Sequence, residues 1–259
     1  MIRGLYTSGW SMLANNKKMD VLSNNLANVN TTGYKKDTVV FESFPDMLTR
    51  RINDSQSFSN ISGRIGSMQL GNDVGEIFTY YTQGNLVRTD NNSDLAIKDS
   101  DTAFFTIEVL DNQGNATEYY TRDGSFVVNA NNQLITKDGH AVMGEEGPIY
   151  LNGGDFIVEA DGTIIQGWDV IDRLLIREFA DPSTLRKYGN NLVSRTAETV
   201  EQEFSGTIQQ GFLEQSNVDI VREMIDMISV MRAYESNQKI LQAQDETLEK
   251  AVNEVGAVR

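Results

Sequence analysis

The amino-acid sequence predicts an α+β protein. Helices at the two ends of the chain are expected to form a coiled-coil-like region, and the middle is expected to fold as an all-β, antiparallel domain. Apolar side chains recur every seven residues near both termini, which is the spacing of a helix that packs against another helix. Between these regions, short runs of β-branched and aromatic residues alternate with turn signals about every ten residues.

Composition narrows the classes of protein to which the chain can belong. Its 259 residues suffice for one large domain or two modest ones. The 37 Asp and Glu against 22 Lys and Arg give a net charge of −15, which argues against nucleic-acid partners. No apolar run approaches the roughly 18 residues of a membrane span, so we expect no membrane insertion. The absence of cysteine excludes disulfides and thiolate metal sites, and the single histidine removes most other metal and acid–base templates.

The N-terminal segment, 1–36, is expected to be an amphipathic helix that ends at Gly33. One column of apolar side chains, spaced seven residues apart, consists of Leu5, Met12, Met19 and Leu26. Leu22 and Val29 lie on the same side of the helix. The helix could pack on a local core or pair with the C-terminal helix. Charge favours the pairing, because 1–36 holds five basic residues and one acidic residue, whereas 213–259 holds nine acidic and five basic residues.

A long C-terminal helix is predicted for 217–255, since neither glycine nor proline occurs between Gly211 and Gly256. Ser216 or Asn217 would cap its start. Two columns keep a heptad spacing: Ile220, Met227, Tyr234, Leu241, Leu248 and Val255, and Met224, Met231, Gln238, Asp245 and Val252. We expect them to pair with the N-terminal column within or between subunits, with Gln238 and Asp245 fixing the register. Segments 1–36 and 213–259 would together form the helical assembly region.

The middle of the chain, 75–212, is predicted to be the β domain. Strands are expected at 104–110, 125–129, 133–136, 156–160 and 174–179, separated by turns rich in Asn, Asp and Gly. The preceding segment, 37–74, is polar and poorly patterned, so we expect an extended connector or a mobile loop there.

Motifs that carry catalysis are missing from the sequence. The chain has no phosphate-binding loop, no zinc-protease motif and no nucleophile elbow. Acidic pairs such as Asp99 with Asp101 are expected to be solvated loop charges rather than a glycosidase site. His140 is expected in a solvated turn, and 111–115 lacks the ligand spacing of a calcium loop. We therefore predict no enzyme activity, no catalytic residue, no metal site and no cofactor.

Motifs near both ends of the chain carry a family resemblance. The N-terminal motif includes Asn24, Asn25, Leu26, Ala27, Asn28, Gly33 and Tyr34. Towards the C-terminus the motif residues are Ser216, Asn217, Glu223, Arg232, Tyr234 and Glu235. Segments 82–86, 94–97 and 120–126 add motifs in the middle. Together they resemble the bacterial flagellar rod and hook protein family, and the chain length is most similar to the rod branch, the distal rod subunit or its close paralogue.

The resemblance implies a structural subunit that self-assembles through its terminal helices into a helical tube, which transmits torque from motor to hook. Its implied partners are further copies of the chain, other rod and hook proteins, and the flagellar type III export apparatus. The implied location is the flagellar basal body, reached by export across the inner membrane without a cleaved signal peptide. Two alternatives stay open: a hook-type axial subunit and, more distantly, an acidic β-domain ligand-binding protein on a coiled-coil stalk.

Overall fold

The computed structural model describes residues 2–50, 64–110, 116–189 and 191–255. The chain divides into two compact units, each built from discontinuous segments. The first unit comprises residues 1–24, 37–78 and 221–259, and the second comprises residues 25–36 and 79–220. Both ends of the chain therefore belong to the first unit.

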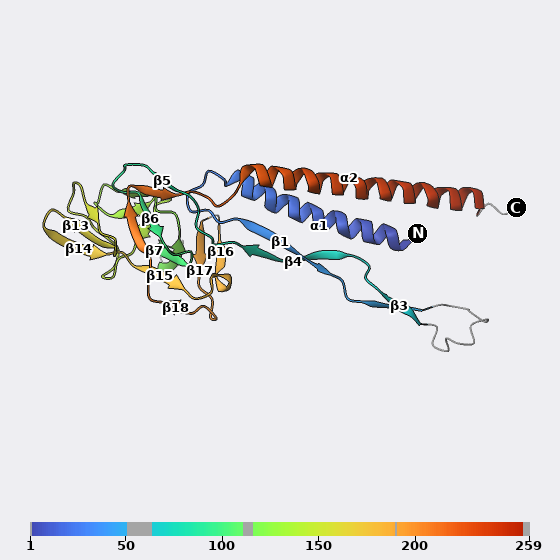
Figure 1. Ribbon diagram of the computed structural model, residues 1–259, viewed down its shortest axis with the longest axis horizontal. Helices are drawn as coiled ribbons and strands as arrows, with labels where there is room; N and C mark the ends of the chain where they lie inside the picture. Colours follow the sequence, from blue (N-terminus) through green and yellow to red (C-terminus); the bar gives the residue numbers. More distant parts are fainter. Residues whose placement is uncertain (1, 51–63, 111–115, 190, 256–259) are drawn as a thin grey trace. The chain divides into compact units, whose positions relative to one another are not determined.

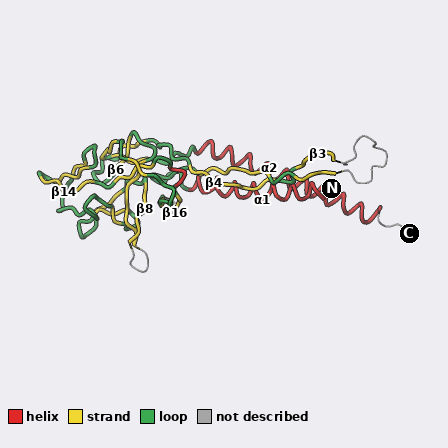
Figure 2. Tube along the Cα trace, turned by 90° about the horizontal axis from the view of Figure 1, so that it is seen from below, coloured by secondary structure: helices red, strands yellow, loops and turns green. Residues whose placement is uncertain are grey.

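The first unit contains two long helices and two short strand ladders. Helix α1 spans Ile2–Ala27, and helix α2 spans Ile220–Lys250 and continues as a π-helical turn at Ala251–Val255. The ladders pair β1 (Asp37–Ser43) with β4 (Asn72–Thr79), and β2 (Met47–Arg50) with β3 (Arg64–Met68). In Figure 1 helix α1 lies between α2 and the β1–β4 ladder, and Figure 2 shows that the strands follow the length of the helices.

Helices α1 and α2 run antiparallel. Asn237 Nδ2 donates a hydrogen bond to Ser11 Oγ over 3.0 Å. Seven residues later on α2 and seven residues earlier on α1, the side chain of Gln244 lies against Gly4. Because Gly4 has no side chain, the Gln244 amide occupies the space that a Cβ would take, and the two backbones can approach closely. These two levels define the register of the helix pair.

Helix α1 also packs against the segment 37–74, for which the sequence predicts a connector or a mobile loop. Lys17 Nζ lies 3.0 Å from Asp73 Oδ1, and Thr7 Oγ1 donates to the Leu70 carbonyl over 2.9 Å. The rings of Trp10 and Phe44 meet edge to face with centroids 5.0 Å apart. As far as it is described, this segment therefore forms strand ladders packed on α1, whereas residues 51–63 lie outside the described part.

The second unit contains the predicted antiparallel β-strands. Its largest sheet has the order β16-β17-β8-β7-β11-β10-β9, and β15 pairs with β7 and with β18. A smaller sheet consists of β12, β13 and β14. Two further sheets pair β19 with β6 and β20 with β5. The strands are β5 (Leu86–Arg88), β6 (Leu95–Lys98), β7 (Ala103–Leu110), β8 (Ala116–Thr121), β9 (Phe126–Val128), β10 (Leu134–Thr136), β11 (Ala141–Val142), β12 (Ile157–Val158), β13 (Thr163–Gln166), β14 (Asp169–Arg173), β15 (Ile176–Phe179), β16 (Arg186–Tyr188), β17 (Leu192–Ser194), β18 (Glu201–Gln202), β19 (Thr207–Gln210) and β20 (Phe212–Glu214). A 3-10 turn occupies Pro182–Thr184.

Two apolar clusters form the core of the second unit. In the larger cluster the rings of Phe105 and Phe126 meet edge to face, with centroids 5.2 Å apart. In the smaller one Tyr120 packs edge to face on Phe179 at 5.0 Å. Each of the five predicted strand segments overlaps an observed strand, so the predicted α+β class with a mostly β middle is confirmed. Neither helix in the described part of the chain has a stretch both long and apolar enough to cross a bilayer.

Candidate assembly interface and buried junction

The inner face of α2, which packs within the first unit, differs from the predicted seam. One series of buried or half-buried positions follows a spacing of four and three residues: Glu223, Met227, Val230, Tyr234, Asn237, Leu241, Gln244 and Leu248. The predicted column through Met227, Tyr234 and Leu241 lies on this face. The second column is displaced by one residue, because Val230, Asn237 and Gln244 face inward where Met231, Gln238 and Asp245 were expected.

Polar side chains occupy inner positions on α2 because α1 presents small residues there. Ser8 is buried and Ser11 half-buried on α1, and Ser11 accepts the Asn237 hydrogen bond. The hydrogen bond compensates the Asn237 amide for the water that it loses. Gln238 and Asp245 are exposed, so neither fixes the register between α1 and α2.

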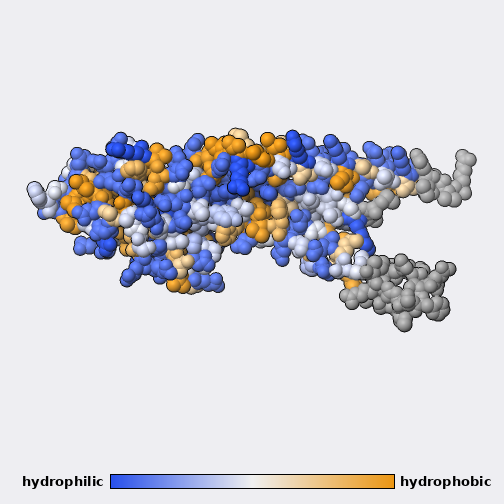
Figure 3. Space-filling model, viewed as in Figure 1, coloured by the Kyte–Doolittle hydropathy of each residue, from blue (hydrophilic) through white to orange (hydrophobic). Residues whose placement is uncertain are grey.

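The outward face of α2 carries large apolar side chains over its first three turns. We name Met224, Ile225, Ile228 and Met231 the outer stripe; their exposures lie between 46% and 61%. Figure 3 shows hydrophobic atoms gathered over this part of α2. Helix α1 also exposes Tyr6 and Leu13. An exposed apolar patch of this kind marks an interaction surface.

The other predicted assembly residues have mixed environments. On α1, Leu22 is buried and Leu5, Met12, Met19 and Leu26 are half-buried, as is Val29 after the helix. On the C-terminal side, Leu248 is half-buried and Ile220 is 42% exposed. The pairing of these residues across the two helices stays a prediction.

Three charged residues from distant segments meet in the interior of the second unit. Lys35 Nζ lies 2.5 Å from Glu214 Oε1, and their side chains are only 4% and 1% exposed. Arg122 Nε lies 3.7 Å from Glu214 Oε2 and is equally buried. Lys35 also donates to the Thr82 carbonyl over 2.8 Å, and Glu214 Oε1 accepts from the Gly84 N–H over 2.8 Å. We name Lys35, Arg122 and Glu214 the buried triad.

Burial shifts the titration of both cations of the triad. It lowers the pKa of Lys35, and the Glu214 carboxylate opposes that shift. Burial likewise lowers the pKa of Arg122, again against the attraction of Glu214. An arginine side chain stays protonated near neutral pH even when its pKa is lowered in this way. Removing Glu214 would therefore leave positive charge inside the protein, which is strongly unfavourable.

Two glycines of the motif segments allow the backbone to pass close to the triad. Gly33 has φ +67°, and a Cβ there would lie 2.5 Å from the Arg122 carbonyl carbon. The Gly33 N–H donates to the Glu214 carbonyl over 2.9 Å. A Cβ at Gly84 would overlap the Gln215 carbonyl. Both positions therefore require glycine, one for its conformation and one for close approach.

Asn217 has a different role from the predicted helix cap. Its Oδ1 accepts from the Lys36 N–H, and its Nδ2 donates to the Tyr80 carbonyl, both over 2.8 Å. Because α2 begins at Ile220, the prediction of Ser216 or Asn217 as its N-cap is wrong. The Asn217 side chain instead joins three chain segments of the second unit. In the same unit, the Tyr34 hydroxyl donates a hydrogen bond to Asn25 Oδ1 over 3.1 Å.

The remaining motif residues are placed as follows. Asn28 is buried and accepts from the Thr31 hydroxyl over 3.2 Å. Ser216 Oγ accepts from the Val218 N–H over 3.3 Å. Glu223 is buried on α2, whereas Asn24, Ala27, Arg232 and Glu235 are exposed.

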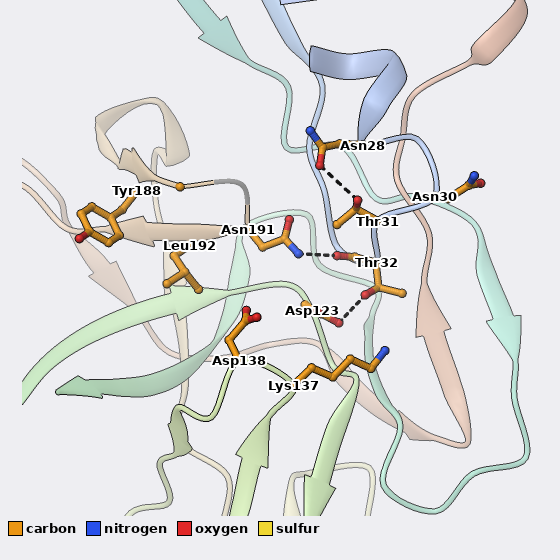
Figure 4. A pocket seen from close by; sticks show the side chains of 11 residues that line it. Asn28, Asn30, Thr31, Thr32, Asp123, Lys137, Asp138, Tyr188, Asn191 and Leu192 are labelled. Atoms are coloured by element: carbon orange, nitrogen blue, oxygen red, sulfur yellow. Dashed lines mark hydrogen bonds between the residues drawn. The ribbon is translucent and has the colours of Figure 1, made fainter. Parts of the chain in front are cut away.

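A polar pocket of about 530 Å³ lies beside the loop that contains Asn28 and Thr32 (Figure 4). Thr32 Oγ1 donates to Asp123 over 2.6 Å, and Asn191 Nδ2 donates to the Thr32 carbonyl over 3.1 Å. These side chains thus tie the loop to the β-strands. Among the described residues, no group of His, Cys, Asp and Glu could hold a metal ion. The segment 111–115, considered as a calcium loop, lies outside the described residues.

Comparison with known proteins matches three regions of the chain to flagellar families. Residues 5–35 match "Flagella basal body rod protein", residues 96–194 match "Flagellar hook protein FlgE/F/G D1 domain", and residues 209–254 match "Flagellar basal body rod FlgEFG protein C-terminal". Lys35, Arg122 and Glu214 each lie in a different one of these regions.

Full-length relatives include proteins of the rod and of the hook–basal body complex. The flagellar basal-body rod protein FlgG of Buchnera aphidicola from Acyrthosiphon pisum is 35% identical over 96% of this chain and 98% of its own. FlgF of Caulobacter vibrioides is 31% identical, and the hook-basal body complex protein FlhO of Bacillus subtilis is 30% identical, each over 100% of both chains.

Proposed function

Since the chain belongs to the flagellar basal-body rod protein family, we propose that this structural subunit of the flagellar rod polymerises into a helical tube through helices α1 and α2. One observation carries the proposal. The inner face of α2 is occupied by α1, yet the outer stripe leaves four large apolar side chains about half exposed. Covering each would contribute roughly 1 kcal/mol.

Repetition of such a contact explains how a filament arises. In a filament the outer stripe would meet a different surface on the next copy, because a stripe-to-stripe contact would close as a two-fold dimer. A head-to-tail contact that does not close on itself generates an open helical assembly. Contacts shared among neighbours would make the tube stiff enough to carry torque.

The proposal includes the wider setting of the subunit. Other rod and hook proteins would contact it at the ends of its segment of the tube. We also propose that it leaves the cell interior through the flagellar type III export apparatus, without a cleaved signal peptide. Helices that gain most of their apolar contacts from neighbours would order fully on incorporation, which would limit polymerisation before export.

The test compares two exposed positions on α2 in the purified full-length protein. Ile225→Asp places a charge in the outer stripe, whereas Ser229→Asp places the same charge at an exposed position outside it. Ile225→Asp should abolish sedimentable polymer and filaments in electron micrographs, and Ser229→Asp should retain both. Equal thermal melting of the β-strands in the two variants would show that folding is intact. Normal polymer from Ile225→Asp would contradict the proposal.

A further inference from the structure

The sheet formed by β12, β13 and β14 presents an apolar row on its outer face. Register places Ile157 opposite Ile165, and Ile165 opposite Val170. Ile157 and Val170 are 64% and 66% exposed. Val158 and Ile164, the sequence neighbours of Ile157 and Ile165, are buried in the larger core cluster. The alternation leaves Ile157 and Val170 exposed on the outside, with half-buried Ile165 between them, and Figure 3 shows hydrophobic atoms gathered at this sheet.

A tryptophan stands at the turn of the same sheet. Gly167 and Trp168 form the two-residue connection between β13 and β14, and Trp168 is 100% exposed. Gly167 has φ +67°, which is what the first position of a tight type II′ hairpin requires. The second position accepts small polar residues, so the turn itself does not require an indole there. Tryptophan is the residue most enriched among binding hot spots.

The sheet is held firmly and is surrounded by negative charge. Val158 N–H donates to Gln210 Oε1 over 3.1 Å, and the Leu174 N–H donates to the Gly162 carbonyl over 2.9 Å. Residues 145–173 include seven Asp or Glu and a single basic residue, Arg173. Arg173 lies 3.5 Å from Glu145 and also donates to the Asp161 carbonyl, so its charge is already partnered.

We propose that Trp168 and the row Ile157, Ile165 and Val170 dock a protein other than this chain, whose surface surrounds an apolar pocket with Lys and Arg side chains. The acidic surroundings select for positive charge on the partner. They disfavour an anionic membrane surface for the same reason. A second copy is disfavoured because its net charge of −15 would oppose these acidic surroundings. This surface is separate from the outer stripe and serves a function beyond polymerisation.

The first experiment uses the full-length chain in flagellated cells. The photo-crosslinking residue p-benzoylphenylalanine is placed at position 168 and, as a control, at Val200, an exposed apolar position elsewhere in the second unit. We expect a defined adduct with a different protein from position 168 only, with Lys or Arg flanking the crosslinked site. Adducts confined to a second copy, a phospholipid or a polysaccharide would overturn the proposal, as would no adduct.

The second experiment measures binding of the purified adduct partner. Trp168→Ser should weaken binding roughly 30-fold, as truncation of a hot-spot tryptophan does, whereas Val200→Ser should leave it unchanged. Raising the salt concentration should weaken binding of the partner to the native chain more than its binding to the Asp169→Asn variant, which has one acidic charge fewer. Trp168→Ser should polymerise normally, which separates this proposal from that for the outer stripe. Unchanged partner binding by Trp168→Ser, or loss of its polymerisation, would overturn the inference.

Discussion

Lys35 and Glu214, which are 179 residues apart in the sequence, meet with 2.5 Å between Nζ and Oε1 inside the second unit. The segment that leaves α1 and the strand that precedes α2 are therefore joined by a buried ion pair. Arg122 adds a second cation to the same carboxylate from the middle of the chain. The triad therefore joins three segments of the second unit that are far apart in the sequence.

Replacing Glu214 should be among the most damaging single substitutions in the second unit. Glu214→Gln removes the negative charge between two buried cations and should lower the free energy of unfolding by roughly 3–5 kcal/mol. The control is Glu201→Gln, because Glu201 pairs with Arg177 and Arg195 at the surface. An exposed pair is worth about 1 kcal/mol or less. Urea unfolding followed by circular dichroism measures both, and equal losses would contradict a central role for the triad.

Gly33 offers a test that separates backbone strain from steric overlap. Gly33 and Gly167 both have φ +67°, but a Cβ at Gly167 would meet no atom within 4 Å. Gly167→Ala should therefore cost only the strain of a positive φ, about 1–3 kcal/mol. Gly33→Ala should cost more, since its Cβ would overlap the backbone at Arg122. Thermal melts of the two variants give the difference, and similar melting temperatures would show that the backbone at Arg122 yields easily.

The helical ends and most strands follow from local patterns, but the inner face of α2 does not. Heptad counting assigns apolar Met224 and Met231 to the seam, whereas the structure places Asn237 and Gln244 at inner positions. The amides fit because Gly4 and Ser11 on α1 leave space and one of them supplies a hydrogen-bond partner. A rule based on hydrophobicity cannot detect this complementarity, because it depends on the partner helix.

In the second unit, the role of the buried triad likewise could not be predicted from local sequence patterns. Lys35, Arg122 and Glu214 all occur in segments that carry the family resemblance, yet the sequence assigned them no role. Charged residues are almost always exposed unless they are paired. Their pairing depends on the tertiary fold, which brings together segments far apart in the chain. Similarly, 37–74 lacks a strong strand pattern, and its ladders lie against α1 through particular contacts such as Lys17 with Asp73.

Glu178 should make part of the stability of the second unit dependent on pH. Burial alone would raise the pKa of Glu178, but hydrogen bonds from Ser205, Ser100 and Thr102 outweigh that effect and hold the pKa below its usual value. Donation from the Ser205 N–H over 2.8 Å and from the Ser100 hydroxyl over 2.9 Å favours the charged carboxylate. The unfolded chain therefore binds the proton more readily than the folded chain does.

This contribution should be complete above the unfolded-state pKa of Glu178 and should be lost as pH falls through the lower folded-state pKa. Glu178→Gln should melt at a lower temperature than the native chain near neutral pH, because its amide cannot accept the same set of hydrogen bonds. The difference between the two melting temperatures should shrink as the pH is lowered towards 3. Melts at a series of pH values measure it, and a difference independent of pH would exclude this carboxylate as the source.

Leu241 tests whether the helix pair is needed for assembly independently of the β-strands. It is half-buried on the inner face of α2, so Leu241→Asp introduces a charge where α2 packs within the first unit. Incorporation into the rod and sedimentation of purified polymer should both be lost. Melting of the β-strands should be unchanged, because their core clusters lie entirely within the second unit. The neighbouring Gln242→Asp adds the same charge at an exposed position and should assemble normally. Assembly of Leu241→Asp would show that the helix pair is dispensable, and unfolding of its β-strands would show that the two units do not fold independently.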